Sequence, residues 1–163
     1  MAKKKTQTTN AMRLLTAKKV NFEAIEYEYE GEISENFGMA ISEITGIPPE
    51  KSFKTLVLKG EKTGYTVACI PVNQELDLKK LAKVTDDKKF EMIHVKDLLA
   101  LTGYIRGGVS PIGMKKKFPT YIDASSENFE EIAVSGGVCG LTLMVKREDL
   151  LTVLDAKSVD IIK

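Results

Sequence analysis

Hydrophobic and polar residues alternate with two different periods along this chain, and these periods predict where helices and strands lie. Apolar residues that recur every three or four positions predict amphipathic helices. Strict alternation, or a run of β-branched and aromatic residues, predicts a strand. The predicted helices span residues 11–19, 34–46, 76–85, 96–103, 127–132 and 147–156. The predicted strands span residues 22–30, 53–59, 65–72, 89–93 and 119–124, with two more inside 132–145 and a short terminal element at 159–163.

Short polar residues and glycines predict the ends of these helices, because they satisfy backbone groups that a helix leaves without partners. The predicted N-terminal caps are Asn10, Ser34, Asp77 and Ser126, and the predicted C-terminal stops are Gly46 and Gly103. In the strand 22–30, alternation places Ile25, Tyr27 and Tyr29 on one face and three glutamates on the other.

Helices and strands interleave throughout, and some strands are joined as hairpins while others are joined through helices. The clearest hairpin joins 53–59 to 65–72 through the glycine-bounded loop GEKTG. This order predicts an α/β mixed (α+β) fold, with a mixed, partly closed, barrel-like sheet surrounded by helices. With 163 residues and no repeat or linker, the chain is expected to form a single domain over 1–163, with residues 1–8 as a disordered tail.

Composition narrows the classes of function. Apolar residues make up 43% and charged residues 29%, as in ordinary globular proteins. No apolar run approaches the roughly 20 residues that cross a bilayer, and the basic, polar N-terminus is not a signal peptide. Two cysteines make a poor disulfide framework, which favours a reducing cytoplasm. We therefore expect a cytoplasmic protein with no membrane partner.

Charge and metal-binding residues exclude further classes. The formal net charge is +1 and aromatic content is 7%, so a plain nucleic-acid-binding domain, and a DNA partner in particular, is not expected. Two local basic patches, Lys3–Lys5 and Arg106 with Lys115–Lys117, either steer a polyanion or are simply solvated. A single histidine and no His/Cys cluster indicate no zinc site, and nothing calls for a cofactor.

Lys54 and Tyr27 are candidate functional residues that also have structural explanations. Lys54 shares a predicted strand face with Leu56 and Leu58, so it is either an edge-strand lysine that blocks aggregation or a cation in a polar cleft. Tyr27 is by default a half-buried packing residue, but its phenol can also donate to a ligand oxygen. Cys69 is expected to be buried, and Cys139 lacks the histidine that a catalytic thiol needs.

Two glycine-rich segments, RGGVSPIG (106–113) and VSGGVCG (134–140), are the other candidates. Glycine pairs allow close backbone approach and leave N–H groups that can bind an anion or a carbonyl oxygen. Either segment alone is explained by a tight turn, whereas both together suggest the walls of one cleft. The longer stretch around the first segment, YIRGGVSPIGMKKKFPTYID, has almost nothing for a core, so it is expected to be bare and to let another group approach its backbone closely.

Four segments together resemble one protein family. They are FKTLVL around Lys54, PVNQELDLKKLAK from Pro71, TGYIRGGVSPIGMKKKFPTYID, and VSGGVCGL. A G-x-x-x-P signature is met by Gly107 and Pro111. The chain resembles the YbaK/EbsC group of aminoacyl-tRNA editing proteins, in its Cys-tRNA(Pro) deacylase branch, which is related to the editing domain of bacterial prolyl-tRNA synthetases.

The resemblance implies a function, a partner and a set of site residues. It implies hydrolysis, in trans, of cysteine wrongly esterified to proline tRNA, often alongside prolyl-tRNA synthetase, with the substrate's own thiol as nucleophile and no cofactor. It implies Lys54 as the essential catalytic residue. The implied substrate-binding residues are Tyr27, Phe37, Gly107, Gly108, Pro111, Ser135, Gly136 and Thr142.

One departure from the family pattern leaves alternatives open. Many members carry GGKRGLD where this chain has GGVCGLT, so Cys139 and Thr142 replace an arginine and an aspartate. The alternatives are an editing enzyme for Ala-tRNA(Pro) or of broad specificity, and a non-catalytic module that binds tRNA or the synthetase.

Overall fold

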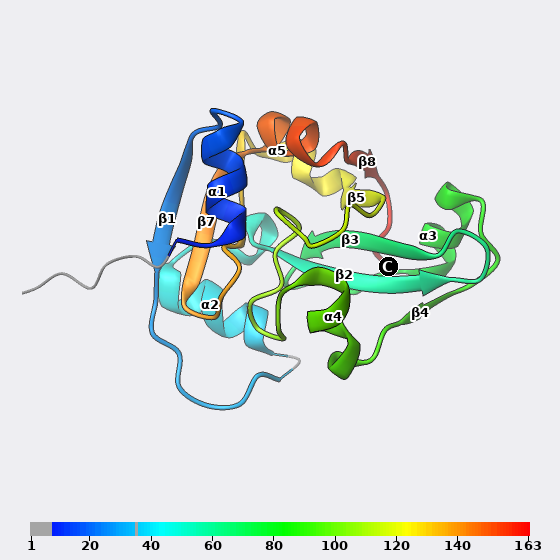
Figure 1. Cartoon of the computed structure of the whole chain (residues 1–163), viewed down its shortest axis with the longest axis horizontal. Helices are drawn as coiled ribbons and strands as arrows, with labels where there is room; N and C mark the ends of the chain where they lie inside the picture. Colours follow the sequence, from blue (N-terminus) through cyan, green and yellow to red (C-terminus); the bar gives the residue numbers. More distant parts are fainter. Residues whose placement is uncertain (1–7, 35) are drawn as a thin grey trace, which may run out of the picture.

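The computed structural model describes residues 8–34 and 36–163, which fold into two β-sheets with helices packed around them (Figure 1). The helices are α1 (Asn10–Ala17), α2 (Phe37–Thr45), α3 (Leu78–Thr85), α4 (Leu98–Thr102) and α5 (Arg147–Leu154). Three 3-10 helices are η1 (Pro49–Lys51), η2 (Val95–Asp97) and η3 (Ala124–Asn128). The strands are β1 (Phe22–Glu26), β2 (Phe53–Gly60), β3 (Tyr65–Pro71), β4 (Phe90–Met92), β5 (Thr120–Asp123), β6 (Glu131–Ser135), β7 (Leu141–Lys146) and β8 (Lys157–Val159).

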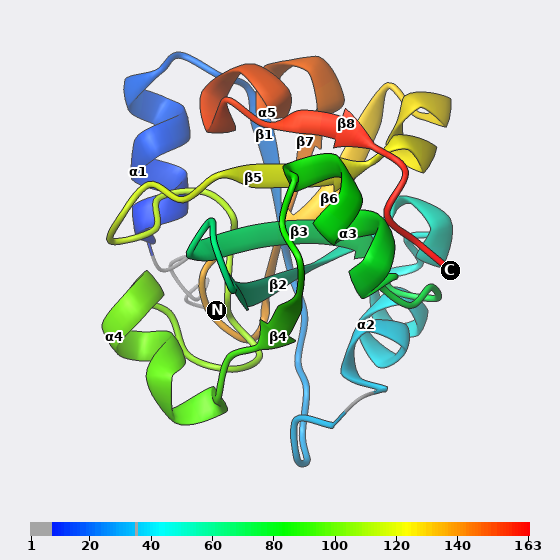
Figure 2. The same cartoon turned by 90° about the vertical axis from the view of Figure 1, so that its right-hand side faces the viewer.

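One sheet has three antiparallel strands in the order β1-β7-β6, and the other has five in the order β4-β2-β3-β5-β8. The five-stranded sheet is mixed, because β2 pairs antiparallel with β3 and β4 while β3–β5 and β5–β8 are parallel. Figure 2 shows these strands stacked from β8 at the top to β4 at the bottom, with α3 lying over the near face. The α+β class predicted from the sequence is confirmed. The sheet is not closed into a barrel, because within the described part of the chain the two sheets are linked by a single bridge, from Ser52 to Ala133.

The two faces of the hairpin β2–β3 bury their side chains in two separate cores. Val57 and Cys69 belong to a large core between the sheets, together with residues of α1, α5 and β7. Leu58 and Ala68 belong to a smaller core under α3. Alternate burial on both faces explains why the strand segments are rich in apolar residues at nearly every position.

Several predicted element boundaries differ from the structure, because more than one nearby side chain can cap the same helix end. Thr9, not Asn10, caps α1 by accepting from the N–H of Met12. Ser34 is not the cap of α2, which begins after Asn36. The predicted helix at 127–132 is wrong: Asp123 caps the 3-10 helix η3, and Glu131 and Ile132 belong to β6.

The predicted strand 22–30 ends early, at Glu26, because Leu141 is the last β7 residue that pairs with it. Tyr27 and Tyr29 therefore follow the strand instead of lying on its face. The caps predicted at Asp77, Gly46 and Gly103 are confirmed. The basic segment Lys3–Lys5 and most of the predicted tail lie outside the described residues, and Thr8 is exposed.

Residues 104–118, here called the proline–glycine loop, are not as bare as their composition suggested. Ser110 and Ile112 are fully buried, and Ile112 belongs to the large core. The phenol of Tyr104 donates to the carbonyl of Ile112 over 2.6 Å, which closes the loop on itself. Within the described part of the chain, no helix is both long and apolar enough to cross a membrane.

Candidate active site

A cavity of about 900 Å³ lies where the two sheets meet. Its lining comes from β2, the ends of β1, β6 and β7, the start of α2, and the proline–glycine loop. The parallel bridge between Ser52 and Ala133 joins the sheets at this place, and both residues line the cavity. A cavity of this volume falls within the range of small-molecule pockets.

Lys54 lines the cavity near the beginning of β2 and is half-buried. It pairs with Ile70 of β3, whereas β4 pairs with β2 only from Leu58 onward. The half-buried side chain of Lys54 lines the cavity instead of standing in open solvent. The cleft explanation for Lys54 fits its position better than the aggregation-blocking one.

Ser135 and Thr142 line the cavity from neighbouring strands and are directly paired in the β6–β7 register. Thr142 is only 6% exposed. The Ser135 hydroxyl accepts a hydrogen bond from the N–H of Gly137 over 3.2 Å. Two hydroxyls on one face of a sheet can donate to or accept from a polar ligand.

Tyr27 lines the cavity directly after β1, where its N–H donates to the carbonyl of Gly140 over 2.9 Å. Burial, with the neighbouring Cys139 thiol adding to it, raises the pKa of Tyr27 to about 12. The phenol therefore stays protonated at neutral pH and is available as a hydrogen-bond donor.

The two glycine-rich segments meet, as their composition suggested. A Cβ placed on Gly108 would lie 2.7 Å from the Cα of Val138, so only glycine allows this approach. Gly107 lines the cavity with φ +90°, in the region that favours glycine. Among the described residues nothing accepts the N–H of Gly107, whereas the N–H groups of Gly108 and Gly136 are bonded to the carbonyls of Ile105 and Leu141.

The cavity brings together six of the nine residues that the sequence singled out. These are Tyr27, Phe37, Lys54, Gly107, Ser135 and Thr142. The other three, Gly108, Pro111 and Gly136, are buried behind the lining. The N–H of Gly136 already donates to the carbonyl of Leu141, whereas no such bond occupies the N–H of Gly107 among the described residues.

Sequence reasoning missed three polar residues that also line the cavity: Asn36, Asn73 and Gln74. Arg106, which the sequence had marked as part of a basic patch, lines the cavity as well. Asn36 precedes Phe37, and Asn73 and Gln74 lie inside PVNQELDLKKLAK, a segment that the resemblance had already marked. The two adjacent amides after a predicted buried strand could have indicated a binding site. They were not singled out, because Asn and other polar residues are common in turns.

Among the residues that the structure describes, those lining the cavity include neither a cysteine nor a histidine. Cys69 is fully buried, and burial raises the pKa of its thiol to about 12. Cys139 is exposed, and partial desolvation raises the pKa of its thiol as well. No group of three His, Cys, Asp or Glu side chains within 8–34 and 36–163 is placed to hold a metal ion.

Known proteins resemble this chain over nearly its whole length. Residues 39–153 match the aminoacyl-tRNA editing domain. EbsC of Enterococcus faecalis, a candidate Cys-tRNA(Pro)/Cys-tRNA(Cys) deacylase, is 49% identical over 162 residues, covering 99% of this chain and 98% of EbsC. The multifunctional Ser/Thr-tRNA deacylase ProXp-y of Escherichia coli is 25% identical, covering 98% of this chain and 95% of its own.

Proteins that match only part of this chain, and a solved structure with the same fold, are also related to tRNA editing and prolyl-tRNA synthetases by their names. The proline–tRNA ligase of Fervidobacterium nodosum is 32% identical over 75 residues, which is 46% of this chain and 13% of the ligase. The crystal structure of a candidate trans-editing enzyme for prolyl-tRNA synthetase has the same fold, with a TM-score of 0.80 and 21% identity over 97% of this chain and 99% of that one. This chain belongs to the aminoacyl-tRNA editing domain family.

Proposed function

We propose that this protein hydrolyses the ester that joins cysteine to proline tRNA, acting in trans and without a cofactor. The observation that carries the proposal is that Lys54 lines a cavity whose described lining residues carry neither a thiol nor an imidazole. Such a cavity suits a substrate that carries its own nucleophile. The 49% identity to a candidate Cys-tRNA deacylase supports the same substrate.

The chemistry begins with the substrate thiol, which attacks the carbonyl carbon of its own ester. A C–S bond forms, the C–O bond to the ribose breaks, and the ribose oxygen takes up the proton that the thiol loses. The cysteine leaves as a thiolactone, which water then opens to free cysteine. An amino acid without a thiol has no equivalent route, so the chemistry itself provides selectivity.

Two groups of this chain stabilise the negative charge that develops on the carbonyl oxygen. They are the ammonium of Lys54 and the N–H of Gly107, two residues that line the cavity. Preorganised donors at a developing oxyanion are among the strongest contributions to catalysis.

The remaining residues hold the amino acid and shape the site. Tyr27 donates its protonated phenol, and Ser135 and Thr142 supply hydroxyls from one sheet face. Phe37 provides an apolar wall. Gly108, Pro111 and Gly136 act from behind, because their burial fixes the loops that carry the lining residues.

Proline tRNA and prolyl-tRNA synthetase are the proposed partners, in the cytoplasm. The match to a segment of proline–tRNA ligases supports a shared substrate. Arg106 lines the cavity, and Lys115–Lys117 are exposed on the same loop, so both can meet tRNA phosphates. Two free thiols fit a reducing compartment.

A second candidate is deacylation of Ser-tRNA or Thr-tRNA, because ProXp-y is related over nearly the whole chain. In that reaction a water molecule, not a substrate thiol, would attack. The lower identity, 25% against 49%, places it second.

A deacylation time course tests the proposal. Proline tRNA charged with cysteine, alanine, serine or 2-aminobutyrate is offered separately; 2-aminobutyrate has a methyl group in place of the thiol. The proteins compared are wild type, Lys54→Ala and Lys59→Ala. Lys59 is the matched control, because it lies on the same strand but is exposed over the ring of Tyr65, outside the cavity.

We expect wild type and Lys59→Ala to cleave the cysteine ester alone, and Lys54→Ala to lose at least about 100-fold in rate, as for removal of one oxyanion donor. Cleavage of the serine ester at a similar rate would favour the second candidate. Cleavage of 2-aminobutyrate would overturn the thiol mechanism. If no ester is cleaved, the chain is a binding module.

A further inference from the structure

The turn after β3 forms one polar end of the cavity. Asn73, Gln74 and Glu75 line it, and among the described residues the side-chain amides of Asn73 and Gln74 have no hydrogen-bond partner. Asn73 is exposed and Gln74 half-buried. Their amides are therefore available to a ligand inside the cavity, each with two donors and one acceptor oxygen.

An aromatic ring lies beside these amides. A Cβ on Gly38 would come within 2.6 Å of the Val72 side chain, so the start of α2 lies against the turn. The ring of Phe37, the residue before Gly38, lines the cavity. Tyr29 packs edge-on against that ring at 4.8 Å between centroids, which restricts its orientation. The cavity end thus combines a held aromatic ring with amide side chains.

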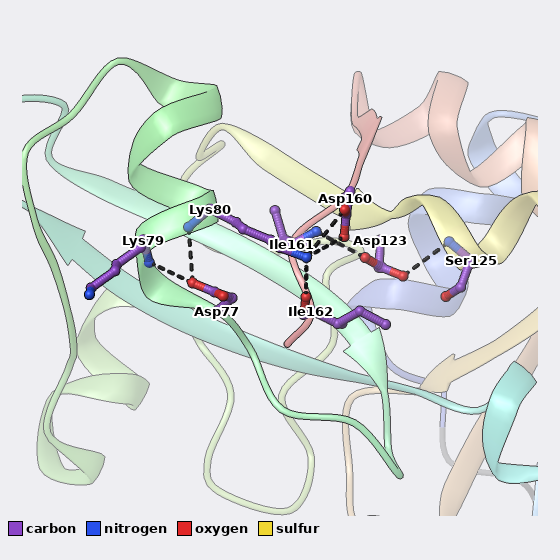
Figure 3. A network of polar contacts seen from close by, with 8 residues as sticks. All are labelled: Asp77, Lys79, Lys80, Asp123, Ser125, Asp160, Ile161 and Ile162. Atoms are coloured by element: carbon purple, nitrogen blue, oxygen red, sulfur yellow. Dashed lines mark hydrogen bonds and ion pairs between the residues drawn. The ribbon is translucent and has the colours of Figure 1, made fainter.

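The chain's last residues, 160–163, hold this turn in place and are here called the C-terminal strap (Figure 3). Asp77 donates its N–H to the carbonyl of Ile161 over 2.7 Å, and Lys163 donates its N–H to the carbonyl of Glu75 over 3.0 Å. On the other side, Ile161 donates to the buried carboxylate of Asp123 over 3.0 Å. The strap therefore connects the turn to the body of the five-stranded sheet.

One side chain of α3 fastens the strap further. The ammonium of Lys80 donates to both carboxylate oxygens of Asp160 over 3.2 Å and to the carbonyl of Ile162 over 2.7 Å (Figure 3). Ile162 also pairs with Leu76 in an antiparallel bridge. Backbone bonds at Glu75, Leu76 and Asp77 give the turn a defined position even though Asn73 and Glu75 are exposed.

The cavity is larger than an amino acid requires. A volume of about 900 Å³ lies near the upper end of the range for sites that hold drug-sized ligands, so it has room for a nucleoside as well. An aromatic ring that stacks on a base, with amides that bond to its edge, is the common way in which proteins recognise an unstacked nucleobase. Asn and Gln pair with adenine through its 6-amino group and N7.

We propose that Asn73 and Gln74, held by the C-terminal strap, bind the edge of the adenine that ends the tRNA, while Phe37 lies against its face. This rests on the proposed function, because the substrate is then a tRNA end. The contact gives no choice between tRNAs, since they share this end. Instead, it fixes the position of the ribose ester relative to Lys54. The reacting carbonyl is thereby held in the orientation that the reaction needs.

Direct binding tests the proposal without depending on catalysis. The probes are the trinucleotide CCA and the same trinucleotide ending in nebularine, a purine nucleoside without the 6-amino group. Binding is followed by amide chemical shifts of the isotope-labelled protein. The variants are the double substitution Asn73→Ala with Gln74→Ala, and Asn128→Ala as a control, because Asn128 is exposed on η3, outside the cavity.

We expect wild type and the control to bind CCA roughly tenfold more tightly than the nebularine form, the size of one good amide–base pair. The double variant should bind both forms equally weakly, with an unchanged melting temperature. Equal binding of the two probes by wild type, an unchanged preference in the double variant, or no binding would each overturn the proposal.

Kinetics separate this proposal from the proposed function. On cysteinyl acceptor-stem RNA ending in adenosine or nebularine, wild type should show the difference mainly in KM, and the double variant should not distinguish the two. A preference in binding with no cleavage would keep the adenine contact and reject the deacylase activity. Cleavage of both RNAs with equal KM values would keep the deacylase activity and reject the adenine contact.

Discussion

The backbone of Gly108 lies against the backbone of Val138, so the proline–glycine loop and the β6–β7 turn (residues 136–140) touch each other. A Cβ at position 108 would lie 2.7 Å from the Val138 Cα and 3.1 Å from the Cys139 nitrogen. This contact sets the spacing between Gly107 on one loop and Ser135 on the strand that enters the other. Both residues line the cavity.

Gly108→Ala should therefore lower both stability and activity. Forcing a methyl group between two backbones costs about 1–3 kcal/mol of unfolding free energy, and relieving it displaces Gly107 from the cavity wall. Gly64→Ala is the control, because Gly64 has φ +78° but open space around it. That variant should lose about 1 kcal/mol through backbone strain and keep its deacylation rate. Urea unfolding and cleavage of Cys-tRNA(Pro) measure the two effects; full activity in Gly108→Ala would show that the loop contact does not position the site.

Thr142→Val should weaken substrate binding without unfolding the protein. The two side chains have nearly the same shape, and the hydroxyl of Thr142, which lies in the cavity wall, bonds to no other described residue. Loss of one hydrogen bond to substrate corresponds to about 0.5–1.5 kcal/mol, a rise in KM of roughly two- to tenfold. Thr152→Val is the control, because Thr152 is exposed on α5 and lies outside the cavity. An unchanged KM would remove Thr142 from the binding residues.

Tyr27→Phe should lower the rate of cysteine ester cleavage but leave its pH midpoint unchanged. Burial raises the pKa of Tyr27 to about 12, so the phenol remains protonated over the pH range in which the more acidic substrate thiol ionises. The rate should rise with pH through that region in both proteins. A midpoint that moves by about one unit or more in the variant would mean that Tyr27 itself titrates in the reaction.

The two cysteines should differ in reactivity toward iodoacetamide. Cys139 is exposed, whereas Cys69 is fully buried in the large core with its pKa raised to about 12. Native protein should take up one label, on the peptide that contains Cys139, and this labelling should need alkaline pH because the pKa of that thiol is also raised. Mass spectrometry counts the labels; Cys139→Ser should take up none when native and one when denatured.

Asp123→Ala should destabilise the protein more than Asp160→Ala does. The Asp123 carboxylate is 2% exposed and accepts from the N–H groups of Ser125 and Ile161, both at 3.0 Å. Leaving these donors without a partner costs about 1–3 kcal/mol. Asp160 is an exposed partner of Lys80, and such pairs contribute less than about 1 kcal/mol. Equal midpoints in urea for the two variants would show that the strap is not anchored at Asp123.

Local signals in the sequence predicted the ends of elements correctly wherever a single residue determines the backbone conformation. Gly46 and Gly103 end their helices with φ +75° and +83°, and Asp77 caps α3 with its side chain, as the sequence indicated. Prediction failed where two short-range options compete. Ser126 resembled a helix cap, but Asp123 caps a 3-10 turn first, and pairing with β7 takes Glu131 into a strand.

By itself, the amino-acid sequence determined the α+β class, the β2–β3 hairpin, and the residues able to line a site. The pattern of apolar residues and the residue types in turns are local properties, so they favour particular helices, strands and turns without contacts from distant segments. Only the tertiary structure decided which candidates share one cavity. Packing of Ser52 against Ala133 brings the sheets together there, whereas Gly108, Pro111 and Gly136 are buried behind the wall. The position of the turn that carries Asn73 and Gln74 was likewise decided by the tertiary structure. The strap that holds it makes contacts between residues more than 80 positions apart, such as Lys80 and Ile162, and no local sequence pattern contains such contacts.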